Sequence, residues 1–135
     1  MTLMQANVQP RQTKYGDAVK IALTDCGHAT NLEILTRIRI SYPDLSATTV
    51  HRITARLSKR GEIGLAPSAA GGDLRYDANI RQHDHFHCVH CDRLLDIIVG
   101  GKLMPLLKSL REDCIVSGPF IVSGLCRQCF NNKEV

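Results

Sequence analysis

The chain has 135 residues, enough for one domain or two small ones, so a large enzyme barrel is excluded. Hydrophobic residues make up 44% and charged residues 22%, and the sequence contains no run of 18 apolar residues and no basic leader before an apolar stretch. We therefore expect a soluble, cytoplasmic protein. With three Phe, three Tyr and no Trp, its cores must be aliphatic and modest, and small domains of this kind often gain stability from a metal or from oligomerisation.

Charge and cysteine divide the chain into two parts. Residues 1–76 hold ten Lys/Arg against six Asp/Glu, while residues 77–135 hold seven of each, so the whole net charge of +4 lies in the first part. A basic module of this kind favours a polyanionic partner. Five of the six cysteines lie after residue 80. We predict a boundary near Asn79, with domains at residues 1–78 and 79–135.

The first part predicts two helices before residue 43. Apolar residues at helical spacing predict a helix over 15–25. A capping box from Thr30 to Glu33 begins a second helix, and Pro43 ends it within a few residues. Its expected buried face consists of Leu32, Leu35 and Ile38.

A third helix, capped by Ser46 and running to about Arg60, carries a basic face. Val50, Ile53 and Leu57 form its buried stripe. Arg52, Arg56 and Arg60 are four residues apart and could reach phosphates and guanine edges in a major groove, although a solvated basic face is the alternative for such a stripe alone. Short strands at 62–67 and 73–79 then predict a hairpin, and this order is typical of a winged helix-turn-helix.

The second part contains two CxxC pairs, Cys88 with Cys91 and Cys126 with Cys129. Four thiolates with no open position describe a structural zinc site. Disulfides or a thioredoxin-like redox pair are the alternatives, but the lack of a secretion signal and the presence of two pairs favour zinc. Cys26 and Cys114 lack this spacing, and we expect them to be buried thiols.

Between these pairs the sequence predicts a small mixed sheet with one helix. We expect a mostly buried strand over 93–99, a helix over 102–113 with Pro105 in its first turn, and a strand-like segment over 115–125. A small sheet with exposed edges is a plausible dimer surface.

Four of the six histidines fall between positions 83 and 90. On an extended strand His83, His85 and His87 point to one face, which is a start for a second metal site. Carboxylates at Asp77 and Asp96 flank the cluster, and a mixed imidazole and carboxylate set suits Fe(II), Mn(II) or Zn(II). Spacing alone leaves the metal open.

These residues resemble the ferric uptake regulator (Fur) superfamily of bacterial metalloregulators, from about Arg11 to Cys129. The motifs that carry the resemblance are His28-Ala-Thr, Ala47-Thr-Thr-Val-His-Arg52, Leu74-Arg-Tyr-Asp77, His83-Asp-His85-x-x-Cys88-x-x-Cys91 and Gly124-Leu-Cys126-x-x-Cys129. The resemblance implies an α+β protein: an N-terminal winged helix-turn-helix, then a small α/β dimerisation domain with a structural zinc on four cysteines. It also implies a homodimeric repressor that binds double-stranded operator DNA.

Family members hold a regulatory Fe(II) or Mn(II) between the domains. The ligands that carry over are His28 at the start of the second helix, Asp77, His83, His85 and Asp96. The DNA-contacting positions are Thr49, His51, Arg52, Arg56, Lys59 and Arg60.

Asp96, where other members have Glu, resembles the peroxide-sensing branch, PerR. The resemblance implies that bound Fe(II) reduces hydrogen peroxide and that a histidine ligand, here His28 or His83, gains oxygen. The alternatives are an iron-responsive repressor and, third, a zinc-responsive one.

Some positions depart from the family pattern. His51 stands where Tyr usually precedes Arg52, which puts an aromatic contact to thymine methyl groups in doubt. His87 and His90 are possible competing ligands. We expect no third metal site, although Asp84 leaves a small chance of one.

Two other classes of function are alternatives to a repressor. A small metallohydrolase is disfavoured, because the sequence has no HExxH motif and no Glu near the histidine cluster to act as a base. The other class is a zinc-stabilised interaction module whose basic helix meets an acidic protein, and competition by nonspecific DNA would argue against it. We therefore predict a DNA-binding repressor, not an enzyme, with no organic cofactor and no membrane partner.

Overall fold

The computed structural model describes residues 13–132, and the chain divides into two compact units. The first unit ends at Ile80 and the second begins at Arg81. Within the described residues no helix is long and apolar enough to span a bilayer.

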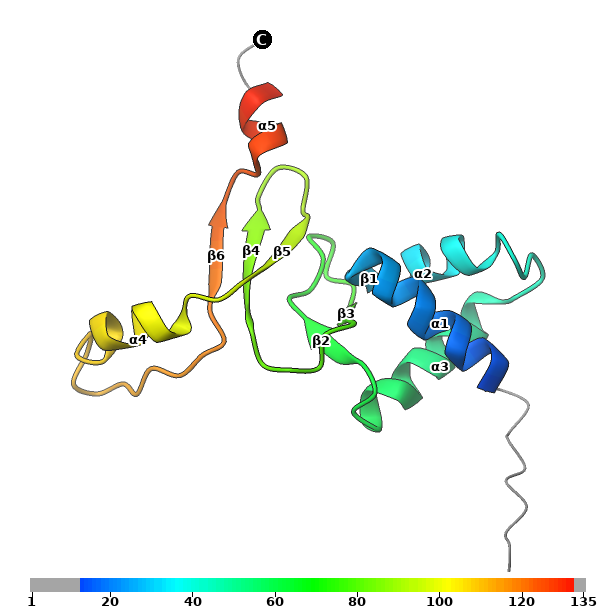
Figure 1. Cartoon of the computed structure of the whole chain (residues 1–135), viewed down its shortest axis with the longest axis horizontal. Helices are drawn as coiled ribbons and strands as arrows, with labels where there is room; N and C mark the ends of the chain where they lie inside the picture. Colours follow the sequence, from blue (N-terminus) through cyan, green and yellow to red (C-terminus); the bar gives the residue numbers. More distant parts are fainter. Residues whose placement is uncertain (1–12, 133–135) are drawn as a thin grey trace, which may run out of the picture. The chain divides into compact units, whose positions relative to one another are not determined.

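Three helices make up most of the first unit (Figure 1). They are α1 (Thr13–Cys26), α2 (Asn31–Ile38) and α3 (Ala47–Lys59). The predicted capping box is present, since the Thr30 side chain accepts from the Glu33 backbone N–H while the Glu33 carboxylate accepts from the Thr30 backbone N–H. The Ser46 side chain caps α3 by accepting from the backbone N–H of Thr49.

The apolar core of the first unit lies among these helices. Val50, Ile53 and Leu57 are buried, as the stripe on the third helix predicts. On α2 the prediction is partly wrong, because Leu35 and Ile38 are buried but Leu32 is 71% exposed. The helix begins at Asn31, as the capping box predicts, but its buried face consists of Ile34, Leu35 and Ile38, so Leu32 in the first turn faces outward.

A three-stranded sheet completes the first unit. Strands β2 (Gly64–Ala66) and β3 (Arg75–Asp77) form the expected hairpin, shorter than predicted. A strand that was not expected, β1 (His28–Thr30), pairs antiparallel with β3, so the strand order is β1-β3-β2. Three helices followed by this wing are a winged helix-turn-helix.

The second unit contains a mixed sheet in which β4 lies between β5 and β6 (Figure 1). Strand β4 (Asp84–Cys88) pairs antiparallel with β5 (Leu94–Ile97) and parallel with β6 (Ile121–Gly124). Two short helices follow β5 and β6, namely α4 (Gly100–Leu107) and α5 (Arg127–Asn132). The α+β architecture predicted from the sequence is confirmed.

Several details of the second unit differ from the predictions. Strand β5 is mostly exposed, because only Leu94 of its four residues is buried. Pro105 lies in the second turn of α4, since this helix starts at Gly100, and the helix ends two residues later. The segment expected to be strand-like over 115–125 forms a strand only in β6, after a cis Gly118–Pro119 peptide bond. Cys26 is half-buried and Cys114 is exposed, so the expectation of two buried thiols is wrong.

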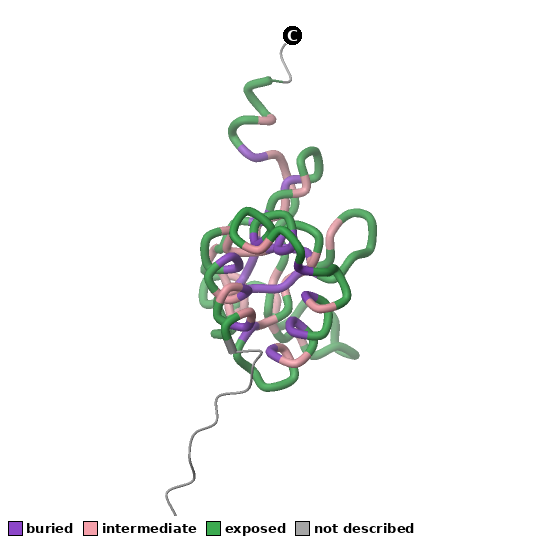
Figure 2. Tube along the Cα trace, turned by 90° about the vertical axis from the view of Figure 1, so that its right-hand side faces the viewer, coloured by how far each residue is buried: buried purple, intermediate pink, exposed green. Residues whose placement is uncertain are grey.

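The second unit buries little apolar surface. Leu94, Cys88 and Cys126 are its buried apolar residues among those described, whereas the whole hydrophobic core cluster belongs to the first unit. The stretch through α5 is largely exposed (Figure 2). An apolar core this small calls for a metal or a partner surface as a further source of stability.

Candidate metal centres and nucleic-acid interface

The four cysteines of the two CxxC pairs come together in the second unit. Their Sγ atoms lie within 4.8 Å of one another, and Cys91 and Cys126 are 3.9 Å apart. A tetrahedral zinc with Zn–S bonds of about 2.3 Å requires sulfur atoms roughly 3.8 Å apart. Strand β4 ends at Cys88 and α5 begins directly after Cys126, so the sheet positions one cysteine of each pair. The set fits a structural zinc site.

The backbone around this cluster favours thiolates. Backbone N–H groups of Cys126 and Cys91 lower the pKa of Cys88 to about 5. The backbone N–H of Cys129 lowers the pKa of Cys126. The Cys129 thiol shares a hydrogen bond with Cys126, which together with burial raises its pKa. The cluster therefore already stabilises negative charge where a cation would bind.

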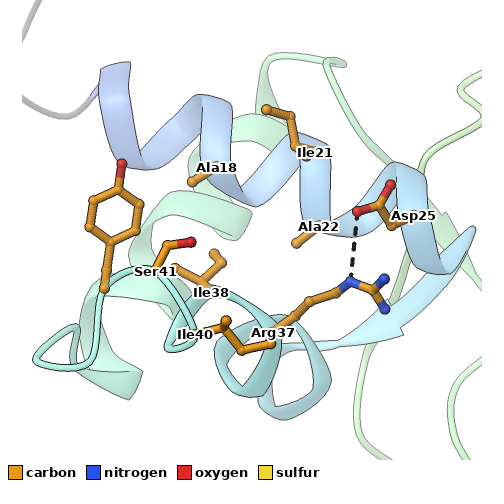
Figure 3. Close-up of a pocket in the computed structure, with 9 residues that line it drawn as sticks. Ala18, Ile21, Ala22, Asp25, Arg37, Ile38, Ile40 and Ser41 are labelled. Carbon is orange, nitrogen blue, oxygen red and sulfur yellow. Dashed lines mark ion pairs between the residues drawn. The ribbon is translucent and has the colours of Figure 1, made fainter.

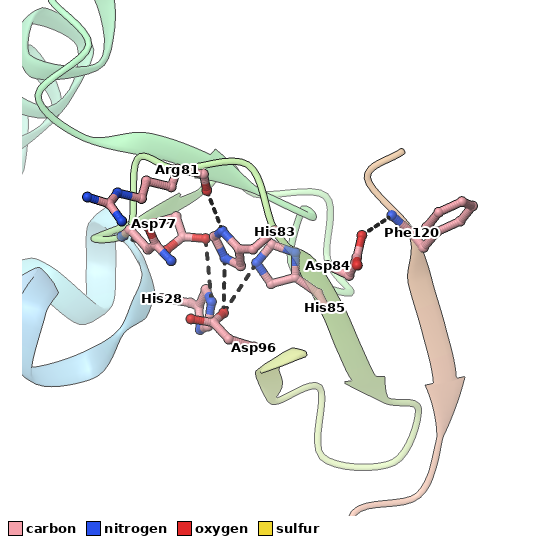
Figure 4. Close-up of polar contacts among 9 residues, drawn as sticks. His28, Asp77, Arg81, His83, Asp84, His85, Asp96 and Phe120 are labelled. Carbon is pink, nitrogen blue, oxygen red and sulfur yellow. Dashed lines mark hydrogen bonds and ion pairs between the residues drawn. The ribbon is translucent and has the colours of Figure 1, made fainter. Parts of the chain in front are cut away.

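His28 and Asp77 form a pair inside the first unit (Figure 4). They are directly opposite each other in the register of β1 and β3, and His28 Nε2 lies 3.5 Å from Asp77 Oδ2. Asp77 is 2% exposed and also accepts the backbone N–H of Asn79. The winged-helix sheet thus holds one imidazole and one carboxylate side by side.

A second set of donors lies on the sheet of the second unit. His85 on β4 is opposite Asp96 on β5, and His83 directly precedes β4 (Figure 4). Asp96 Oδ1 is 3.1 Å from His83 Nε2 and 3.6 Å from His85 Nε2, and the two rings are 4.4 Å apart between centroids. The alternation on this strand predicts the convergence of the two imidazoles, and the strand pairing adds the carboxylate.

Asp84 has a structural role. Its Oδ2 accepts the backbone N–H groups of Val99 and Gly100 at the start of α4, both at 2.9 Å, and its Oδ1 accepts that of Phe120 at 2.8 Å (Figure 4). These backbone donors lower the pKa of Asp84, that of Phe120 most. Both oxygens are engaged, which argues against a third metal site at this carboxylate.

His87, two residues after His85 on β4, has a partner outside the set formed by His83, His85 and Asp96. Its Nε2 lies 2.7 Å from Asp92 Oδ1, and Asp92 adopts the left-handed conformation with φ 67° in the turn after Cys91. Asp is one of the residues that tolerates this conformation. His87 thus ties β4 to the turn that carries the first CxxC pair, and His90 is exposed within that turn.

The predicted DNA-contacting residues share helix α3. His51, Arg52, Lys59 and Arg60 are exposed, while Thr49 and Arg56 are half-buried. Thr49 bonds the Ser46 hydroxyl at 2.9 Å, and Arg60 lies 3.6 Å from the carboxylate of Glu62. The exposed cations on this helix can contact phosphates.

The model of the "Ferric uptake regulator family" matches residues 18–100, which is more than half of the chain and includes α3, the wing, and the His28, Asp77, His83, His85 and Asp96 positions. The chain belongs to the ferric uptake regulator family. Members of this family are metal-dependent transcription regulators and not enzymes.

Individual relatives agree with this assignment. The "Transcriptional regulator PerR" of Clostridium acetobutylicum is 32% identical over 60 residues, which cover 43% of this chain and 44% of that protein's length. The ferric uptake regulator Fur of Helicobacter pylori matches in structure with a TM-score of 0.65 and 23% identity, over 88% of this chain and 84% of that one. The peroxide stress regulator of Campylobacter jejuni matches with a TM-score of 0.63 and 20% identity, over 96% and 100%. The two structures show the shared fold.

A hollow of about 400 Å³ lies elsewhere on the first unit of this Fur-family chain (Figure 3). Apolar residues of α1 and the end of α2 line it, with an ion pair between Arg37 and Asp25 at 3.7 Å. The lining contains no histidine and no nucleophile beside a base. This hollow therefore offers no support for a hydrolase.

Sequence reasoning missed the residues that support the functional side chains. Asn31 bonds His51 and Thr54, which are 20 and 23 positions away along the chain, and no spacing rule signals such a contact. The sequence also gave no sign that His28 lies on a strand, because three residues are too few to show alternation.

Proposed function

We propose that this chain is a metal-dependent, DNA-binding transcriptional repressor. The observation that carries the proposal is the presence, in one Fur-family chain, of a winged helix with an exposed basic α3 and of His/Asp donor sets in both units. The α3 cations would contact phosphates and base edges of double-stranded operator DNA. The contacts proposed are those of Thr49, His51, Arg52, Arg56, Lys59 and Arg60.

Two kinds of metal site follow from the donors. Zn(II) would be held by Cys88, Cys91, Cys126 and Cys129 as a structural ion, because four thiolates leave no position for a substrate or an oxidant. A regulatory Fe(II) or Mn(II) would take its ligands from two sets. The first unit contributes His28 and Asp77, and the second contributes His83, His85 and Asp96.

A ligand set divided between the units explains regulation. Neither the pair in the first unit nor the three donors in the second is a complete set for a six-coordinate ion. An ion that needs both sets stabilises only those arrangements of the units that satisfy it, and DNA selects arrangements as well. Metal and operator affinities must then be reciprocally coupled.

Peroxide sensing is the proposed signal. Hydrogen peroxide would be the two-electron oxidant and bound Fe(II) the catalyst: the O–O bond breaks, one oxygen atom is inserted into a ring C–H bond of His28 or His83, and the other leaves as water. The match to PerR and the Asp at position 96 support this signal. The oxidised histidine, His28 or His83, would then no longer bind the ion, which removes the coupling to DNA. An iron-responsive repressor, or a zinc-responsive one, is the alternative, since the same donors serve those roles.

We also propose that the protein acts as a homodimer in the cytoplasm, where operator DNA is found. The second unit exposes large apolar side chains, including Ile98 and Ile115 at 89% and 97% exposure, while its buried apolar residues are few. A second copy would cover such a surface and place two basic helices on two half-sites.

DNA binding with and without metal tests the proposal. Duplexes selected from a random pool should bind the zinc-loaded protein tightly only with added Mn(II) or Fe(II), and the affinity should fall steeply with salt. Asp96→Ala should lose the response to metal, whereas Asp113→Ala, at an exposed carboxylate paired with Arg111, should keep it. Tight binding that ignores the second metal would overturn metal dependence, and the absence of any selected duplex would overturn the repressor.

A further inference from the structure

His51 lies on the exposed side of α3, and one of its ring nitrogens is held from within the protein. His51 Nδ1 is 3.1 Å from the side-chain amide nitrogen of Asn31, the first residue of α2. An amide nitrogen only donates hydrogen bonds, so the Nδ1 it meets must accept. This assignment requires that the amide nitrogen of Asn31, and not its amide oxygen, faces His51.

Thr54 fixes the direction of the Asn31 amide. Its hydroxyl lies 2.7 Å from Asn31 Oδ1 and is fully buried, one turn along α3 from Val50 and His51. The distance is the usual one for an O–H···O bond, whereas an N–H···O bond is usually about 2.9–3.0 Å. The reversed amide would therefore fit this contact less well.

The hydroxyl proton has one preferred acceptor. Thr54 Oγ1 is also 3.2 Å from the backbone oxygen of Val50 and 3.1 Å from that of His51. A hydroxyl has a single proton to donate, and the shorter bond to Asn31 takes it. Both amide hydrogens of Asn31 are then on the side that meets His51.

The chain of bonds runs from Thr54 through Asn31 to His51 Nδ1. A neutral imidazole that accepts at one nitrogen carries its proton on the other. We infer that Asn31 and Thr54 hold His51 as the Nε2–H tautomer, so that α3 presents a fixed hydrogen-bond donor that reads an acceptor of guanine or thymine in the operator and disfavours cytosine. The base-reading role rests on the proposed function.

The bases that suit this donor follow from the major-groove code. Guanine presents two acceptors there, O6 and N7, and thymine presents one, O4. Cytosine presents an amino donor, which a fixed N–H donor would face unfavourably, and adenine places an amino group beside its N7. A rotatable hydroxyl could donate or accept, but a held Nε2–H cannot reverse.

The tautomer is tested first, without DNA. Nitrogen-15 NMR of the zinc-loaded full chain at slightly alkaline pH distinguishes protonated from unprotonated ring nitrogens, and the spectrum of His51→Gln identifies the His51 signals. We expect Nε2 to carry the proton and Nδ1 to be unprotonated. Thr54→Val should lose this preference while Thr54→Ser, which keeps the hydroxyl, should retain it. A proton on Nδ1 in the unaltered protein would overturn the inference.

Base reading is tested on duplexes selected with the metal-loaded protein. At one position in each half-site, guanine or thymine should be preferred by roughly fivefold or more over cytosine. His51→Ala and Thr54→Val should remove most of this preference, while Thr54→Ser should keep it. Thr54 is buried and is not one of the proposed DNA contacts, so Thr54→Val should leave binding to nonspecific DNA within about twofold. An unchanged base preference in His51→Ala would overturn this inference but leave the proposed function standing. Failure to select any duplex would overturn the proposed function, and the base-reading role of His51 with it.

Discussion

At the scale of single residues, Asp84 shows how one carboxylate organises the second unit. It connects β4 to the start of α4 and to the residue before β6, because three backbone N–H groups donate to it. Asp84→Asn would replace one accepting oxygen with an amide NH2 group. That group would face backbone N–H donors, and at least one of these donors would lose its acceptor.

We expect Asp84→Asn to lower the thermal midpoint of the zinc-loaded second unit by several degrees, measured by thermal unfolding and by hydrogen exchange in β6 and α4. Asp113→Asn is the control, because Asp113 is exposed and bonds only its neighbours Arg111 and Cys114. Equal midpoints for the two variants would contradict the role assigned to Asp84.

The pKa values in the cysteine cluster predict how many protons zinc binding releases. Zinc binds thiolates, so each thiol still protonated at the working pH must release a proton on binding. Cys88 and Cys126 have lowered pKa values, and that of Cys88 is about 5, so Cys88 is already a thiolate at pH 7. Zinc binding at pH 7 should therefore release fewer than the four protons expected of four ordinary thiols. Calorimetry in buffers of different ionisation enthalpy measures the number, and a release of four would refute the thiolate character of Cys88.

At the scale of elements, strand pairing decides where the metal donors lie. Sequence patterns predict the three helices of the first unit, both CxxC pairs and the alternation that aligns His83 with His85. They fail for β1, for the exposed side of β5 and for Leu32. A three-residue strand shows no period, and in a helix as short as α2 both Leu32 and Ile34 stand at helical spacing from Leu35 or Ile38, so spacing does not decide which of them faces the core.

Strand register also explains why the His28–Asp77 pair could be expected only by resemblance. The two residues are 49 positions apart, and they meet because Ala29 and Thr30 pair with Tyr76 and Arg75. No local pattern specifies such a long-range pairing. The same holds for Asn31 and His51, which meet only when α2 packs against α3.

The capping box that follows β1 has a measurable energetic contribution. Thr30→Ala removes the acceptor for the Glu33 backbone N–H and should destabilise the first unit by about 1 kcal/mol in chemical denaturation. Thr24→Ala is the matched control, since that exposed hydroxyl only bonds the Lys20 carbonyl within α1, and Ala is the better helix former. A cost for Thr24→Ala as large as that for Thr30→Ala would show that the cap is not the cause.

At the scale of the whole molecule, the two units have different sources of stability. The apolar core cluster of the described chain lies entirely in the first unit, and the second combines a small sheet with the four-cysteine cluster. Folding of the second unit should therefore depend on metal, as in other domains with small cores.

Zinc removal by a chelator under reducing conditions should separate the two units. Amide protection in β4, β5 and β6 should be lost, while that of α2 and α3 should persist, as measured by hydrogen exchange with mass spectrometry. Loss of protection in both units together would instead indicate one cooperative unit, and retained protection in the sheet would exclude a structural role for the zinc.

The most direct test of peroxide sensing combines chemistry with DNA binding. The zinc-replete protein is loaded anaerobically with Fe(II), given a stoichiometric pulse of hydrogen peroxide and analysed by peptide mass spectrometry and operator binding, with a Mn(II)-loaded sample as the control. We predict one added oxygen on the peptide containing His28 or His83, in the iron sample only, together with release of the operator. Unmodified histidines and retained operator binding would contradict peroxide sensing and point to an iron-responsive or other metal-responsive repressor.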